Sequence, residues 1–135
     1  MTKFRCGCTA SCVGLAIVVG IIVGIIAAFL SFTEAITLTP AFLWTTFGIG
    51  IVYLAILLAT SLFRSCTGGC LCTNLGTLLV SILGLILTSL ILLGVTFAVG
   101  SVLGAIFAGA TVGFLALTVA ATACLVNCLS GCSED

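Results

Sequence analysis

The feature that most constrains the fold is a long stretch of sequence without any charge. Residues 65–133 contain no Asp, Glu, Lys or Arg. A soluble domain stays in solution with charges dispersed over its surface, at about 25% of its residues. Here only 4% of residues are charged and 63% are hydrophobic. The chain is therefore expected to fold in a lipid bilayer or inside an assembly.

Four apolar runs are long enough to cross a bilayer, because about 20 residues of helix span the roughly 30 Å of hydrocarbon. They cover residues 13–32, 40–63, 75–94 and 102–127. The first run follows Lys3 and Arg5, as in a secretory signal, but it is longer than a signal core, so we expect it to be retained. The prediction is an all-α chain with four transmembrane-type helices in a single domain, residues 1–135.

Local signals mark the starts of two of these helices. Thr39 followed by Pro40 suits a capping residue and a first helical position, because Pro lacks an N–H that would be unpaired there. Thr73 or Asn74 is expected to cap the third helix in the same way. Inside the helices, the hydroxyl groups are expected to bond to their own backbone or across to a neighbouring helix. These are the side chains of Tyr53, Thr77, Ser81, Thr88 and Ser89.

The two halves of the chain share a pattern of cysteines and threonines. The sequence Cys6-x-Cys8-Thr9 recurs as Cys70-x-Cys72-Thr73. Ala-Thr followed by Cys-x-x-Gly-Cys occurs towards the end of both halves, at residues 59–70 and 121–132. The pattern predicts two tandem helical hairpins, with repeats over about residues 6–70 and 70–132, each entering and leaving on the same side.

This topology predicts that all nine cysteines lie on one face. The two termini and the segment between the second and third helices share that side, and each contributes three cysteines. The nine are Cys6, Cys8, Cys12, Cys66, Cys70, Cys72, Cys124, Cys128 and Cys132. Two cysteines four apart on one helix are poorly oriented for a disulfide, so bonds are expected between segments or between subunits. Because nine is odd, at least one cysteine stays free or pairs with another chain.

Other uses of these cysteines stay open. Thiolates bind zinc and iron–sulfur clusters, but the sequence has no His and lacks the usual C-x-x-C spacing. Lipidation next to the membrane and free thiols packed as small hydrophobes are further alternatives. The basic residues Lys3, Arg5 and Arg64 lie on the same side as the cysteines. Because basic residues near membrane helices are usually on the cytoplasmic side, we expect the cysteine face to lie in the cytoplasm, where thiols stay reduced.

Small residues spaced four apart indicate where helices approach closely. Glycine is also common in membrane helices for other reasons, so this signal is not specific. The candidate packing positions are Gly20, Gly24, Ala55, Ala59, Ala105, Gly109 and Gly113.

Four segments carry a resemblance to a group of known proteins. They are residues 39–44 (TPAFLW), 47–49 (FGI), 52–54 (VYL) and 122–125 (TACL). In these segments the chain resembles small, cysteine-rich, four-helix hydrophobic proteins encoded by spore-forming Gram-positive bacteria, which have no assigned activity. The resemblance implies a spore or envelope setting in which proteins are oxidised and cross-linked after release, and it assigns no functional residues.

Charge distribution excludes several classes of function. The helices hold no acid, base or activated nucleophile, which disfavours an enzyme, a transporter or a cofactor site. A net charge of zero without a basic stripe disfavours nucleic acid as a partner. We expect a non-enzymatic structural protein of a membrane or of a spore or envelope layer. It would associate with itself and with lipid as a sheet, tube or filament, with its cysteines available for cross-linking. The alternatives are a membrane thiol redox or metal-binding protein and a small pore-forming, holin-like protein.

Overall fold

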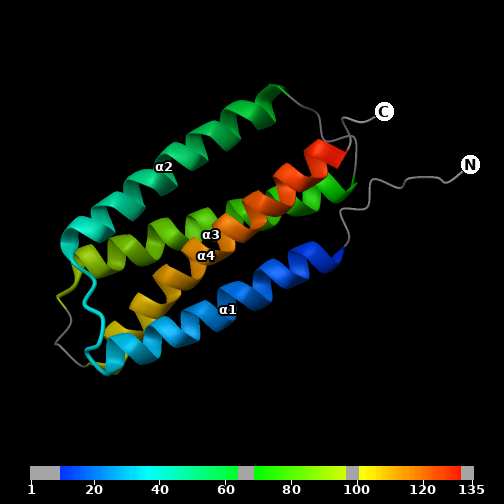
Figure 1. Ribbon diagram of the computed structural model, residues 1–135. Coiled ribbons are helices and arrows are strands. Elements are labelled where there is room, and N and C mark those ends of the chain that lie inside the picture. Colours follow the sequence, from blue (N-terminus) through cyan, green and yellow to red (C-terminus); the bar gives the residue numbers. More distant parts are fainter. Residues whose placement is uncertain (1–9, 64–68, 97–100, 132–135) are drawn as a thin grey trace, which may run out of the picture.

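The computed structural model describes residues 10–63, 69–96 and 101–131, with side chains at residues 12–59, 75–96 and 101–127. Four helices make up the described chain (Figure 1): α1 (Ala10–Phe32), α2 (Pro40–Phe63), α3 (Gly69–Gly94) and α4 (Val102–Gly131). The predicted all-α, four-helix class is confirmed. All four helices are long and apolar enough to cross a membrane.

The helix boundaries agree with the predictions at most ends. At the start of α2, the backbone N–H of Phe42 donates to Thr39 Oγ1 at 3.4 Å, which confirms the predicted cap. The predicted cap of α3 is wrong, because α3 begins at Gly69 and includes Thr73 and Asn74. No helix breaker separates Gly69 from Asn74, so the helix extends back towards its N-terminus. The sequence reading also missed Ser101, whose Oγ accepts from the N–H of Gly104 at the start of α4.

The helices lie side by side along one long axis, in the spatial order α2, α3, α4, α1 (Figure 1). Each contacts its neighbour in this order, and the most extensive interface joins α1 to α4. In the described part of the chain, no comparable interface joins α1 to α2. The second half of the chain is therefore a packed hairpin, whereas the first half is held together through α3 and α4. The sequence repeat itself stays a prediction.

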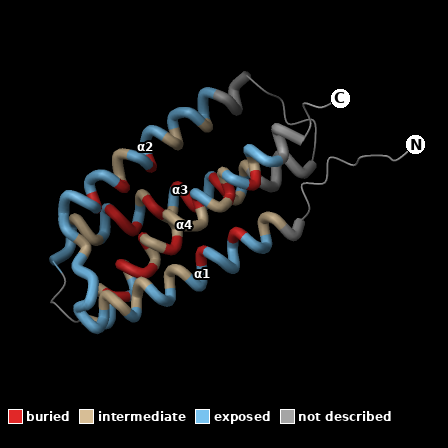
Figure 2. The backbone as a smooth tube through the Cα atoms, viewed as in Figure 1, coloured by how far each residue is buried: buried red, intermediate tan, exposed pale blue. Residues whose placement is uncertain are grey.

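The buried residues are concentrated on α3 and α4, between the two outer helices (Figure 2). Leu78, Ile82 and Leu85 of α3 are almost completely buried, as are the hydroxyl side chains of Ser81 and Ser89. Apolar side chains of α2 pack against the cluster to which Leu78 and Ile82 belong. The core is therefore mainly a layer of α3 and α4 residues that includes both apolar and hydroxyl side chains.

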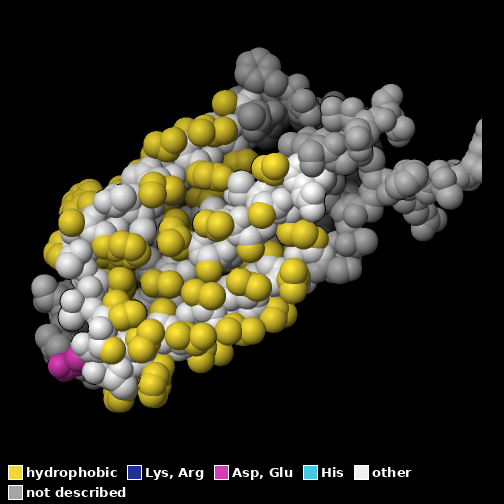
Figure 3. Space-filling model, in the orientation of Figure 1, with side chains coloured by type: hydrophobic (Ala, Val, Ile, Leu, Met, Phe, Trp, Pro, Cys, Tyr) yellow, Lys and Arg dark blue, Asp and Glu magenta, His cyan; other side chains and the backbone are white. Residues whose placement is uncertain are grey.

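The exterior is apolar on every helix (Figure 3). Ile22 on α1, Leu87 on α3 and Val119 on α4 are each more than half exposed, and Trp44 near the start of α2 is 62% exposed. Within the described residues the only charged side chain is Glu34, in the turn between α1 and α2, where its φ is 59°. Such a surface suits hydrocarbon and not water.

Candidate functional site

Glycines bring α1 and α4 into close contact. A Cβ atom on Gly109 would lie 2.5 Å from Ala28 Cβ and 2.6 Å from the carbonyl oxygen of Gly24. A Cβ on Gly24 would lie 3.1 Å from the carbonyl oxygen of Gly109, and one on Gly113 would lie 3.0 Å from that of Gly20. The two glycine pairs therefore face each other, and the backbone that each approaches belongs to the same chain.

The alanines among the predicted packing positions lie in different surroundings. Ala105, one turn before Gly109 on α4, is 7% exposed. Ala55 and Ala59 on α2 are exposed. The pair on α2 is thus left outside the packing of the described chain.

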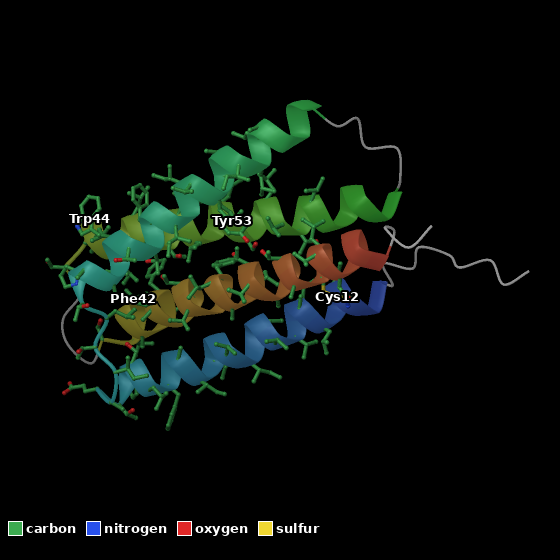
Figure 4. The ribbon with its side chains drawn as sticks, turned by 45° about the horizontal axis from the view of Figure 1, so that its top comes forward. Cys12, Phe42, Trp44 and Tyr53 are labelled. Atoms are coloured by element: carbon green, nitrogen blue, oxygen red, sulfur yellow. A yellow bond between two sulfur atoms is a disulfide. The ribbon has the colours of Figure 1, made fainter. Side chains whose placement is uncertain are left out.

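A disulfide joins Cys12, in the first turn of α1, to Cys124, about two turns before the end of α4. The two Cα atoms are 6.1 Å apart, and 112 residues separate the cysteines in sequence. Figure 4 shows Cys12 beside the last part of α4. The predicted bonding between different segments is thus seen within one chain, next to the glycine contacts that align the same two helices.

We call the end of the molecule where α1 and α3 begin and α4 ends the cysteine end (Figure 1). Three other cysteines lie in the terminal turns of helices there. Cys70 and Cys72 belong to the first turn of α3, and Cys128 belongs to the last turn of α4. The remaining four, Cys6, Cys8, Cys66 and Cys132, lie outside the described residues. Within the described chain, no group of three or more His, Cys, Asp or Glu residues is close enough to hold a metal ion.

An apolar groove of about 370 Å³ runs along the contact between α1 and α4. Gly20 and Gly24 on α1 and Gly109 and Gly113 on α4 form part of its floor, with isoleucine side chains along its rims. None of the described residues that line the groove has a hydroxyl or charged side chain. It provides an apolar surface along this contact.

Two pairs of hydroxyl groups connect helices inside the bundle: one joins α2 to α4, and the other joins α4 to α3. Tyr53 Oη donates to Thr122 Oγ1 at 3.0 Å, which confirms the predicted hydrogen bond to a neighbouring helix (Figure 4). Thr122 donates to the carbonyl oxygen of Thr118 at 2.7 Å. Thr118 Oγ1 lies 2.7 Å from the carbonyl oxygen of Phe114 and 3.2 Å from Ser81 Oγ. Ser81 in turn lies 2.8 Å from the carbonyl oxygen of Leu78.

Two cavities meet at Tyr53. An open cleft of about 510 Å³ lies between α2 and α4 and is lined by Tyr53, Val119, Thr122, Ala123, Val126 and Asn127. A smaller, more enclosed cavity of about 60 Å³ lies between α2, α3 and α4. Tyr53, Val119 and Thr122 line both cavities, so the two are neighbours, and the smaller one is almost entirely apolar.

Sequence reasoning did not single out the buried threonines of α4. Thr111 is fully buried and Thr118 is 6% exposed. Their spacing of seven, with Thr122 four residues further, places them on one side of the helix, and this spacing was the available signal. The prediction that every inner hydroxyl finds a partner is wrong at Ser89, whose buried Oγ has none.

No family model matches the chain, and no curated protein or solved structure is found to be similar to it.

Proposed function

We propose that this chain is a non-enzymatic structural protein of a membrane, and that its copies associate and become linked through cysteines at the cysteine end. The observation that carries the proposal is the uniformly apolar exterior of the four described helices, on which only the turn residue Glu34 is charged. A surface of this kind requires a cover of lipid or of other copies. A spore or envelope layer is the setting implied by the resemblance alone.

The packing of α2 supports self-association. Its extensive contacts are with α3, and its exposed Ala55 and Ala59 form a small-residue pair like those that join α1 to α4. On the other outer helix, α1, Gly20 and Gly24 are already packed against α4. A contact between α2 of one copy and α1 of the next would use two different surfaces. Such contacts repeat into rings or open filaments.

Cysteine stoichiometry supports a covalent link between copies. The Cys12–Cys124 bond uses two of the nine cysteines, which leaves seven. Seven cysteines cannot all pair within one chain, so full oxidation requires a bond to a second molecule.

Non-reducing and reducing gel electrophoresis of protein from native membranes tests this proposal. We expect a ladder of disulfide-linked species that collapses to monomer on reduction. Cys70 belongs to both cysteine motifs, so Cys70→Ser is expected to weaken the ladder most. Cys12→Ser, which opens the bond within the chain, serves as the matched control and should retain the ladder. A monomer under both conditions, with seven alkylatable thiols before reduction, would contradict covalent self-association.

A membrane thiol redox protein is the second candidate, and the Cys12–Cys124 disulfide is the observation that favours it. Such a protein would oxidise a dithiol by thiol–disulfide exchange, which leaves Cys12 and Cys124 as thiols. A separate two-electron acceptor, such as a quinone or a second disulfide, would then have to reoxidise them in each cycle. Cys124 is only 8% exposed, which favours a permanent bond instead. Repeated oxidation of a small dithiol by catalytic amounts of the protein would support the redox function over the structural one.

A further inference from the structure

Helix α1 is attached to the rest of the described chain almost entirely through one interface. Its extensive contacts are with α4, its contacts with α3 are minor, and it lies apart from α2, the next helix in sequence (Figure 1). The interface with α4 comprises the glycine contacts and the Cys12–Cys124 bond. Detachment of α1 from α4 would therefore leave the contacts among α2, α3 and α4 in place.

A detached α1 would be stable in a bilayer by itself. Of the four membrane-spanning segments, that of α1 is the most apolar and has the smallest buried share, at 11%. A helix makes its backbone hydrogen bonds internally, so a single helix can remain in hydrocarbon. The described residues that line the groove along the contact with α4 are all apolar, so both surfaces tolerate lipid once they separate.

The connection between α1 and α2 contains a strained residue. Glu34 has a φ of 59°, in the left-handed region that residues other than glycine adopt at a cost. The N–H of Glu34 donates to the carbonyl oxygen of Ser31 at 3.3 Å. The next N–H, of Ala35, donates to the carbonyl oxygen of Leu30 at 3.0 Å. In helix ends of this kind the left-handed residue is usually glycine. Residues 33–37 are all exposed, so the connection can straighten at Glu34 without loss of packing.

We propose that α1 is exchanged between two copies of this chain, so that α1 of each copy packs against the glycines of α4 of the other. Exchange of an identical element is a low-cost route to association, because each contact between α1 and α4 is made again between copies. Strain in the connection favours exchange, because Glu34 leaves the left-handed region when the connection straightens. The proposal rests on the proposed self-association and names a surface at which copies meet.

Cys124 can reveal which copy supplies the α1 that packs against α4. It is only 8% exposed and is bonded to Cys12 in the closed chain, so Cys12 of another copy reaches it only where the chain's own α1 has left. Val126 lies two residues further along α4, faces a different side of the helix and is 58% exposed. A cysteine at this position would report chance collisions at nearly the same depth in the membrane.

The experiment uses full-length chains in which serine replaces all but one cysteine. A chain that keeps Cys12 and a chain that keeps Cys124 carry different tags and are produced in the same membrane. A brief pulse of copper–phenanthroline links adjacent thiols, and each pair passes two protons and two electrons to molecular oxygen. We expect a disulfide-linked heterodimer of these two chains. We expect little linkage of the Cys12 chain to a control chain whose single cysteine is introduced by Val126→Cys.

A chain that keeps both Cys12 and Cys124 tests whether the serine replacements preserve the fold, because it should form the bond between α1 and α4. Failure to form this bond, within a chain or between chains, would contradict the contact on which exchange depends. Formation of the bond without heterodimers in the single-cysteine pair would overturn the proposal. Linkage to Val126→Cys equal to linkage to Cys124 would also overturn it.

Substitutions of Glu34 in the single-cysteine chains test the role of strain. Glu34→Gly relieves the strain of the closed chain, whereas Glu34→Val increases it, because a β-branched residue adopts a positive φ least readily. Both substitutions remove the same charge, so each is the matched control for the other. We expect roughly fivefold or more heterodimer with Glu34→Val than with Glu34→Gly. Equal yields would overturn exchange through a strained connection.

The ladder of the original chain is measured separately, because the single-cysteine chains cannot form it. A ladder without heterodimers would overturn exchange alone. Heterodimers without a ladder would support exchange and contradict only the covalent link at the cysteine end.

Discussion

At the scale of single residues, the glycines at the contact between α1 and α4 are expected to tolerate substitution least. The neighbours of Gly109 include the backbone carbonyl oxygen of Gly24, which cannot move as a side chain can. Gly48 on α2 differs, because nothing lies within 4 Å of the position a Cβ would occupy. The role of a glycine here depends on its partner across the interface and not on its helix.

We predict that Gly109→Ala destabilises the protein, because its methyl group would force α1 and α4 apart. Overpacking of this kind costs about 1–3 kcal/mol. Unfolding of the purified protein by a denaturing detergent, followed by circular dichroism, measures the change. Gly48→Ala is the control and should be neutral or stabilising by up to about 1 kcal/mol, because Ala favours helix more than Gly does. Equal effects of the two substitutions would show that the glycine contacts do not hold α1 in place.

At the scale of helices, α1 is attached to the bundle by two independent means. The glycine contacts align it with α4 along its middle, and the Cys12–Cys124 bond fixes its beginning. Beyond α4, α1 makes only minor contacts, with α3. Removal of the disulfide should therefore weaken the attachment of α1 without changing the order of the helices.

We predict that Cys12→Ser lowers the free energy of unfolding by about 2–4 kcal/mol, the usual contribution of a disulfide that closes a long loop. Cys124→Ser should have a similar effect, and the double variant should add little, because each single variant already breaks the bond. Detergent unfolding under non-reducing conditions measures all three. Additive losses would indicate that the two cysteines stabilise the protein separately.

At the scale of the whole molecule, the apolar exterior determines where the protein can reside. Ile22 lies near the middle of α1 and is 52% exposed, whereas Ile36 is 46% exposed in the connection between α1 and α2. In a bilayer these two positions differ in depth although their exposure is similar. They therefore allow the same substitution to be compared in hydrocarbon and near the membrane boundary.

We predict that Ile22→Arg impairs membrane insertion, because an arginine at the centre of a spanning helix costs about 2.5–3.5 kcal/mol on insertion scales. Ile36→Arg should be tolerated, since a long basic side chain near the membrane boundary reaches water. The fraction of protein that resists alkaline carbonate extraction measures both effects. Equal resistance of the two variants and the original chain would argue that other copies, and not lipid, surround α1.

The sequence by itself determined the fold class, the run of apolar residues in each helix and the cap at Thr39. These depend on composition and on local spacing, which can be read along the chain. The start of α3 at Gly69 was not predicted, because Thr73 and Asn74 are typical capping residues but lie inside the helix.

Only the tertiary structure decided which helices and side chains are partners. It paired Gly20 and Gly24 with Gly109 and Gly113, and it joined Cys12 to Cys124. It also brought together two hydroxyl pairs, Tyr53 with Thr122 and Thr118 with Ser81. The physical reason is that these helices are apolar on every side, so no polar face distinguishes the inside from the outside. Partners are then selected by the fit of small residues and hydroxyl groups between helices far apart in sequence, and no local pattern records that fit.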